Sequence, residues 1–250
     1  MTTLYLGWQD PDSREWFVIG SLTRANGVYE FRYVKGVKRA QETGFAPLLA
    51  FSNINEIYKS PALFPLFQNR ILNGDRPEWP EFLKQLNLSE DIKDNPIAVL
   101  ARSAGTRATD HLEVFPKPEK GEDNSYHVHF FLRGLRHIKA GECGRHEEVE
   151  KGERLFVCRD LQNAVDPNAL LLRTKDCCGI GYVPRYLRDD LNHLLKEDSD
   201  ALKVVVERFN KPPAPLQYRI LCKASAPWPD DWRPMSSSEF EPINADDRVG

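Results

Sequence analysis

The sequence predicts an α+β protein made of two modules, and three patterns in the chain support this prediction. Residues 3–34 alternate apolar and polar side chains, as half-buried strands do, and the apolar spacing then changes to that of short helices. Residues 126–224 hold short strand-like segments at regular intervals with one helical segment among them, a pattern typical of a small β-barrel. The stretch between these blocks is rich in proline and charge, which is typical of a linker.

The first module is expected to place strands before helices, with one more strand at its end. We expect strands at 3–8, 16–22, 27–34 and 110–115, and short helices at 60–72, 76–89 and 94–105. In the first of these helices Ser60 is the expected N-cap, and Pro61 would occupy the first helical position. The last helix is expected to end at Gly105.

The second module is expected to be mostly strand. Its strands are predicted at 126–135, 154–159, 169–173, 178–183, 202–208 and 218–223. One helix begins at Pro184, and its apolar stripe consists of Leu187, Leu191, Leu194 and Leu195. The predicted domains are therefore residues 1–116, a linker at 117–125, a barrel at 126–224 and an extended tail at 225–250. Trp228 and Trp232 are expected to anchor this tail to the surface of a domain.

Composition disfavours several classes of protein. The net charge is −3 and no basic block exists, so the chain is not expected to coat long nucleic acids by counter-ion release. No apolar run approaches the roughly 18 residues of a membrane helix, and the first residues lack the pattern of a signal peptide. Cys177 and Cys178 are adjacent, which suits neither an ordinary disulfide nor a CxxC redox motif. We therefore expect a cytoplasmic protein without a membrane partner.

Polar side chains are crowded in one turn between two predicted strands. Within ten residues the turn holds Arg159, Asp160, Gln162, Asn163, Asp166 and Asn168. Asn and Asp favour turns for local backbone reasons, but six such groups exceed what one chain reversal requires. The turn is therefore a candidate binding site, with a purely structural turn, in which Asp166 holds its own backbone, as the alternative.

Three motifs of the second module resemble the HIRAN domain. They are "GLRH" at 134–137, "GERLFVCRDLQNAVDPNALLL" at 152–172 and "GIGYVPRYLRDDL" at 179–191, and the resemblance covers residues 126–210. That domain is a modified small β-barrel found in certain chromatin-associated DNA translocases and alone in bacterial proteins. The resemblance implies binding of single-stranded DNA at a free 3′ end. The residues that it implies for nucleic-acid binding are Arg136, His137, Arg159, Asn163, Asp166, Tyr182 and Arg185.

The resemblance also implies a role for each part of this set. Arg136 and His137 would contact the terminal nucleotide, and Asp166 would accept a hydrogen bond from the 3′ hydroxyl. His137 replaces the usual Tyr, and Val165 stands where an aromatic residue is common. Since stacking contributes about 1–3 kcal/mol per base, these two departures predict weak binding.

The first module resembles the N-terminal subdomain of HipA-family kinases over residues 3–115. The motifs that resemble it, in order, are "IGSLTRANGVYEFRYV", "GFAPLLAF", "PLFQNRI", "FLKQLNLS" and "NPIAVLARSAGTRATDHLEVF". No kinase core follows in the sequence, because phosphate-cradling and catalytic motifs are absent. The resemblance implies an antitoxin-like protein that docks on a separately encoded HipA-like Ser/Thr kinase. Docking requires an exposed apolar patch, expected around Phe64 and Phe67 or around Tyr29, Phe31 and Tyr33, unless these aromatics fill the core of the module itself.

The prediction is a non-catalytic protein without cofactor or metal. A rival is a DNA-processing or defence accessory protein whose first module binds a different protein. A metal-dependent enzyme is a further alternative, because His127, His129, Cys143 and His146 could ligate zinc. These four residues lack the spacing of known structural zinc sites.

Overall fold

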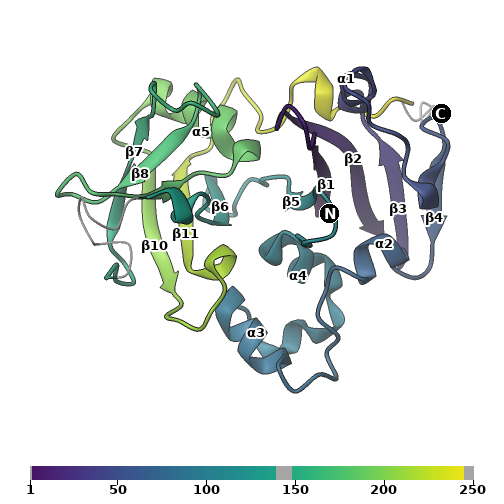
Figure 1. Ribbon diagram of the computed structural model, residues 1–250, viewed down its shortest axis with the longest axis horizontal. Coiled ribbons are helices and arrows are strands. Elements are labelled where there is room, and N and C mark those ends of the chain that lie inside the picture. The colour runs from purple at the N-terminus through teal and green to yellow at the C-terminus, as the bar shows by residue number, and fades with distance from the viewer. Residues whose placement is uncertain (1, 139–147, 245–250) are drawn as a thin grey trace. The chain divides into compact units, whose positions relative to one another are not determined.

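The computed structural model describes residues 2–138 and 148–244, which form two compact units (Figure 1). Of the described residues, the first unit contains those up to Trp79, Glu90–Lys117 and those from Pro234 onward. The second unit contains Pro80–Ser89 and the described part of Pro118–Arg233. Each unit has its own antiparallel sheet, so the architecture is mixed α/β.

The sheet of the first unit has five strands in the order β4-β3-β2-β1-β5. The strands are β1 (Thr3–Gln9), β2 (Trp16–Ala25), β3 (Val28–Tyr33), β4 (Ile57–Ser60) and β5 (Leu112–Pro116). The turn between β2 and β3 is Asn26-Gly27, with φ values of 51° and 78°. An Asn-Gly pair with two positive φ angles is the favoured two-residue hairpin connection, because its twist matches that of the strands.

Short helices and 3₁₀ turns complete the first unit. They are α1 (Gly36–Glu42), η1 (Leu49–Phe51), α2 (Pro65–Gln68), η2 (Glu90–Asp94), α4 (Pro96–Ser103) and η6 (Ser238–Phe240). Helix α4 is capped by the side chain of Asn95, which accepts a hydrogen bond from the amide of Ala98 at 3.2 Å. The predicted helix at 60–72 is wrong in both bounds, because Ser60 pairs with Tyr29 as the last residue of β4 and the helix ends at Gln68. Pro65, rather than Pro61, occupies the first helical position.

The aromatic residues of the first module fill its own core. Phe31 is fully buried and stacks on Phe51 with ring centroids 4.1 Å apart. Tyr33 donates to the carbonyl oxygen of Phe51 at 2.8 Å, and burial raises the pKa of Tyr33 to about 12. Tyr29 and Phe67 are also buried, and Phe64 packs against the same cluster. The exposed apolar patch predicted around these five aromatics is therefore wrong, since the core of the unit already uses them.

The sheet of the second unit has six strands in the order β6-β11-β10-β7-β8-β9. The strands are β6 (Ser125–Phe131), β7 (Arg154–Arg159), β8 (Leu170–Arg173), β9 (Gly179–Tyr182), β10 (Lys203–Phe209) and β11 (Ile220–Pro227). The sheet is curled, and an isolated bridge between Arg133 and Tyr182 joins the chain that leaves β6 to β9, the opposite edge strand. Both hydrogen bonds of this bridge are 2.8 Å long. The predicted small barrel is thus present as a curled sheet whose edges are joined by one bridge.

The helices of the second unit have their apolar sides buried. Helix α5 (Arg185–Glu197) follows Pro184 as predicted, and its residues Leu187, Leu191 and Leu194 are buried. Helix α3 (Trp79–Leu86) contributes Phe82, whose ring lies 5.9 Å from that of Tyr218. Short 3₁₀ turns η3 (Leu135–His137) and η5 (Leu216–Tyr218) complete the described part of this unit.

The cysteines do not all behave as the sequence predicts. Cys158, Cys177 and Cys222 have free thiols, but Cys178 is disulfide-bonded. Its neighbour Cys177 has a φ of 66° and is exposed, whereas Cys178 is buried, so the two adjacent side chains point into different surroundings. The cytoplasmic location expected from the cysteine pattern stays a prediction. Within the described ranges, no helix is long and apolar enough to cross a membrane.

The C-terminal segment is held at two places, as predicted for its tryptophans. The ring of Trp232 stacks on His193 at 4.3 Å and that of Trp228 lies 6.5 Å from Tyr126, both within the second unit. Further along, the carbonyl oxygen of Glu241 accepts a hydrogen bond from the amide of Lys35 at 2.8 Å in the first unit. Residues 234–244 are therefore part of the first unit.

We expect a single cut between the modules to leave the two fragments associated. A cut near Lys120 leaves residues 80–89 on the N-terminal fragment, although they pack in the second unit, where the amide of Asn210 donates to Gln85 at 2.8 Å. Residues 234–244 remain on the C-terminal fragment, although they pack in the first unit. Limited proteolysis should give two bands on a denaturing gel and one peak in native size-exclusion chromatography.

The matched control for this cut is a chain that ends at Arg233, which lacks one of the two exchanged segments. After the same cut and at the same urea concentration, the two fragments of this shorter chain should separate more readily than those of the full chain. Two peaks from the nicked full chain would contradict the expectation.

Candidate nucleic-acid interface

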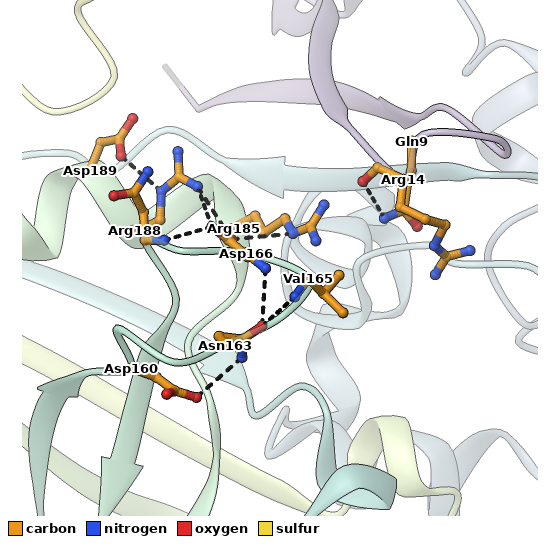
Figure 2. A network of polar contacts seen from close by, with 10 residues as sticks. Gln9, Arg14, Asp160, Asn163, Val165, Asp166, Arg185, Arg188 and Asp189 are labelled. Carbon is orange, nitrogen blue, oxygen red and sulfur yellow. Dashed lines mark hydrogen bonds and ion pairs between the residues drawn. The ribbon is translucent and has the colours of Figure 1, made fainter.

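The polar turn between β7 and β8 is organised by its own side chains. The side-chain oxygen of Asn163 accepts hydrogen bonds from the amides of Val165 and Asp166, each at 3.0 Å (Figure 2). Oδ1 of Asp166 accepts the amide of Asn168 at 3.0 Å. Such side-chain-to-backbone bonds are the local reason for Asn and Asp in this turn. The structural alternative is therefore correct for part of each side chain, and the remaining polar groups of Asn163 and Asp166 contact residues outside the backbone of the turn.

A second set of bonds connects the turn to β9. The side-chain amide of Asn163 donates to Oδ2 of Asp160 at 3.2 Å, and the hydroxyl of Tyr182 donates to the same oxygen at 2.8 Å. Burial raises the pKa of Tyr182, and its bond to the Asp160 carboxylate raises it further. The ring of Tyr182 is thus held in one position beside the turn.

Tyr182 also positions the "GLRH" motif. The backbone of Tyr182 pairs with Arg133, and the next residue, Gly134, has a φ of 70°. A Cβ atom on Gly134 would lie only 2.8 Å from Cδ2 of Tyr182, so glycine is needed both for the backbone conformation and for the close approach of the ring. Gly134 precedes η3, whose residues Arg136 and His137 are exposed.

The carboxylate of Asp166 lies between two arginines at the start of α5. Arg188 donates from one terminal nitrogen to both carboxylate oxygens, at 3.1 and 3.3 Å, and Nε of Arg185 lies 3.5 Å from Oδ2 (Figure 2). The side chain of Asp166 is 12% exposed, so this charge cluster is only partly screened by water. The cluster places two guanidinium groups beside the turn.

Arg188 is a functional candidate that the sequence prediction missed. It follows Arg185 by three residues on a helix, and this spacing puts both side chains on one face. Burial lowers the pKa of Arg188, but the carboxylates of Asp189 and Asp166 more than offset this effect and raise it overall. The i, i+3 spacing was the signal that could have identified it.

Four of the seven predicted residues, Asn163, Asp166, Tyr182 and Arg185, are linked by these hydrogen bonds and ion pairs. Arg136 and His137 lie on η3, shortly after the bridge to Tyr182. Arg159 has a different partner. Its Nε donates to the side-chain oxygen of Asn192 on α5 at 3.0 Å, which directs the guanidinium toward the helix.

Two exposed apolar side chains flank Asn163 in the turn. Leu161 is 78% exposed and Val165 is 70% exposed. Val165 occupies the position where the family resemblance suggests an aromatic residue, and Leu161 was not predicted from the sequence. Together they give the rim of the polar turn an apolar surface that can contact a base or a sugar.

The comparison with known families assigns this part of the chain. Residues 125–228 match the model of the HIRAN domain family. This segment is a HIRAN domain. The match begins at β6 and ends directly after β11, so it covers the whole curled sheet. A HIRAN domain suggests nucleic-acid binding, which agrees with the juxtaposition of guanidinium groups and oxygen acceptors described above.

Two solved structures are similar to the chain at low identity. A crystal structure of a protein from Lactobacillus plantarum is 16% identical, with 41% of this chain and 96% of that chain covered and a TM-score of 0.33. The HIRAN domain of human HLTF is 16% identical, with 42% and 81% covered and a TM-score of 0.31. No curated protein matches the sequence. The resemblance of residues 3–115 to HipA-family kinases stays a prediction.

The metal alternative has no support in the part of the chain that the structure describes. No group of three or more potential ligands lies together among the described residues. Nε2 of His127 faces Asp123 at 3.2 Å, and Ser125 contacts the same nitrogen. Cys143 and His146, the other predicted ligands, lie outside the described residues.

We predict that Gly134→Ala destabilises the HIRAN domain more than a matched glycine substitution. Gly152 has a φ of 88° in the same unit, but a Cβ atom there meets nothing within 4 Å. Gly152→Ala should lower the free energy of unfolding by about 1 kcal/mol, from backbone strain alone. Gly134→Ala adds the clash with Tyr182, which should cost about 1–3 kcal/mol more. Urea unfolding followed by circular dichroism measures both. Equal losses would show that the Tyr182 ring does not rest on Gly134.

Proposed function

We propose that the HIRAN domain binds single-stranded DNA at its 3′ end and that the protein is a non-catalytic binding protein. The observation that supports this most is the pairing of Asp166 with Arg185 and Arg188 at the rim of the polar turn. A terminal nucleotide presents a hydroxyl group and a phosphate close together. Carboxylate and amide oxygens accept from a hydroxyl, and guanidinium groups bind phosphate with charge-assisted hydrogen bonds.

The two oxygens of Asp166 differ in how they are occupied. Oδ1 accepts from Arg188 at 3.1 Å and from the amide of Asn168, whereas the contacts of Oδ2 with Arg188 and Arg185 are longer, at 3.3 and 3.5 Å. An ionised carboxylate offers about four acceptor positions. We therefore assign Oδ2 as the acceptor of the 3′ hydroxyl, with the arginines turned toward the adjacent phosphate.

The η3 turn supplies the remaining contacts in this proposal. Arg136 would bind a phosphate and His137 would stack on the terminal base. A His ring stacks less strongly than the Tyr usual in the family, and Val165 replaces a second aromatic group. We expect affinity in the micromolar range or weaker.

We predict that a 3′ phosphate weakens binding relative to a 3′ hydroxyl. The phosphate would remove the hydroxyl donor and bring negative charge to Asp166. A lost hydrogen bond to a charged group costs about 1.5–3 kcal/mol, which is roughly a ten- to hundredfold loss of affinity. Fluorescence anisotropy with 5′-labelled oligonucleotides that differ only at the 3′ end measures this ratio.

For variants, the decisive quantity is the ratio of the affinities for the 3′-hydroxyl and 3′-phosphate oligonucleotides, rather than either affinity alone. Asp166→Asn removes a negative charge and should raise affinity for any oligonucleotide, but it should abolish the preference for the hydroxyl. Asp189→Asn is the matched control, because it removes a carboxylate that pairs with Arg188 at 3.0 Å outside the turn. The control should keep the preference. A preference that survives Asp166→Asn, or that is absent from the natural protein, would mean that the turn is only structural.

For the first unit, we propose docking on a HipA-like kinase core, with an antitoxin-like role. The observation that favours it is Leu49, which is fully exposed within the "GFAPLLAF" motif of the resemblance. The rival is a DNA-processing or defence protein whose first unit binds a different partner.

We expect Leu49→Asp to weaken capture of a HipA-like kinase core encoded beside this protein. Leu161→Asp is the matched control, since Leu161 is also an exposed leucine but lies in the HIRAN domain. Co-purification at micromolar concentration measures both. Failure of the unaltered chain to form a complex would favour the rival function.

A further inference from the structure

The outward face of the second unit's sheet carries a row of basic side chains. Strand pairing places His129 beside Lys223, Lys223 beside Val205 and Val205 beside Arg154, across β6, β11, β10 and β7. Because paired residues point to the same side of a sheet, these side chains share one face. The neighbouring row of paired residues adds two more cations. Lys203 pairs with Ser225, and Arg173 pairs with Phe156. We call Arg154, Arg173, Lys203 and Lys223 the outer basic face.

The outer basic face contrasts with the rest of the protein. The chain has a net charge of −3, yet none of the four cations forms an ion pair with a carboxylate of a described residue. Glu207 lies on the same side of β10, next to a bulge, and its carboxylate accepts from Asn87 at 3.4 Å. Unpaired cations on one face of an acidic protein indicate a site for an anionic partner.

An exposed aromatic ring lies among these cations. Phe156 on β7 is 37% exposed, and the guanidinium of Arg154 lies 5.3 Å from the centre of its ring. Most large apolar side chains of this unit are buried on the inward face, so an exposed ring beside two arginines is not part of the core. Aromatic rings and arginines on a sheet surface can stack on bases and neutralise phosphates at the same time.

The face continues into the candidate site. Cys158 on β7 pairs with Leu171 on β8, and Leu171 pairs with Tyr182 on β9, so all three lie on the side of Phe156. Two strand spacings and one two-residue step separate Phe156 from Tyr182, which is about 12 Å in a regular sheet. A strand that ends at Asp166 therefore has a continuous surface to follow past Tyr182 toward Phe156.

We infer that the outer basic face binds the nucleotides on the 5′ side of the terminal nucleotide in a single-stranded nucleic acid. Arg154, Arg173 and the two lysines would bind phosphates, and Phe156 would stack on a base. The inference rests on the proposed function, because the 3′ end held at Asp166 gives the strand its starting point. Binding of this kind is independent of base sequence and depends on length and salt.

The test compares oligonucleotides of 3, 6 and 12 nucleotides, each with a 5′ label and a 3′ hydroxyl, on the full-length protein. Affinity should rise with length. The dependence on salt should also become steeper, since each phosphate contact to a single strand adds about 0.7 to the logarithmic slope. The trinucleotide should report only the site around Asp166.

Variants separate the outer basic face from the end-binding site. Arg154→Gln combined with Arg173→Gln should lower affinity for the 12-mer at least tenfold and reduce its salt slope by about 1.4, the equivalent of two phosphate contacts. Phe156→Ala should lower affinity for the 12-mer about five- to hundredfold, the range expected for one lost stacking contact. Both variants should bind the trinucleotide normally and keep its preference for a 3′ hydroxyl. The matched control is Lys196→Gln combined with Lys211→Gln, which removes two exposed cations elsewhere in the unit.

The outcomes distinguish this inference from the proposed function. Equal affinity for 3- and 12-mers, with the hydroxyl preference intact, would overturn the inference and leave end recognition standing. The inference would also be overturned if the lysine control lost as much affinity for the 12-mer as the double arginine variant. Competition by a 12-residue glutamate peptide as strong as that by the unlabelled 12-mer would overturn it too, because the face would then bind anions in general. If affinity rises with oligonucleotide length but a 3′ hydroxyl is not preferred, the outer basic face binds single strands and end recognition at Asp166 is overturned. No binding of any oligonucleotide would overturn both.

Discussion

The second unit depends on the pairing of Tyr182 with Arg133. Two backbone hydrogen bonds of 2.8 Å join the opposite edges of the curled sheet at this point, and the side chain of Tyr182 bonds to Asp160 in the polar turn. One residue thus connects three parts of the chain that are far apart in sequence: η3, the β7–β8 turn and β9. Unpaired backbone groups at sheet edges are costly or prone to association, so the bridge also protects part of each edge. The same residue lies between the proposed end-binding site and the outer basic face, on the side of the sheet that carries Phe156.

The carboxylate of Asp166 has two opposing effects on the neighbouring arginines. Asp166 neutralises part of the field of Arg185 and Arg188 in the absence of a ligand, which limits the cost of holding two guanidinium groups near each other. The same carboxylate competes with any phosphate for those groups. This arrangement favours selectivity over affinity, because a ligand must satisfy the carboxylate as well as the arginines.

Local patterns in the sequence predicted local structure well, and contacts between distant residues less well. The alternation in β3, the Pro184 start of α5 and the anchoring tryptophans were confirmed, since each depends on nearby side chains. The start of α2 was wrong because pairing with β3 takes Ser60 into the sheet, an effect invisible in a local pattern. The site residues inferred from motifs stay predictions, although contacts link four of them. Arg188 was missed because its importance comes from a contact with Asp166 across 22 positions in the chain.

The segment at residues 80–89 has a consequence for how this protein can evolve. Its contacts with Tyr218 and Asn210 belong to the second unit, but it lies outside the stretch that matches the HIRAN family. Residues 234–244 show the reverse arrangement, because they follow the HIRAN stretch but pack in the first unit. Gene fusion usually moves contiguous stretches of coding sequence. Neither unit of this protein can be passed to another gene as one uninterrupted piece without losing part of its packing, so the two are expected to be inherited together.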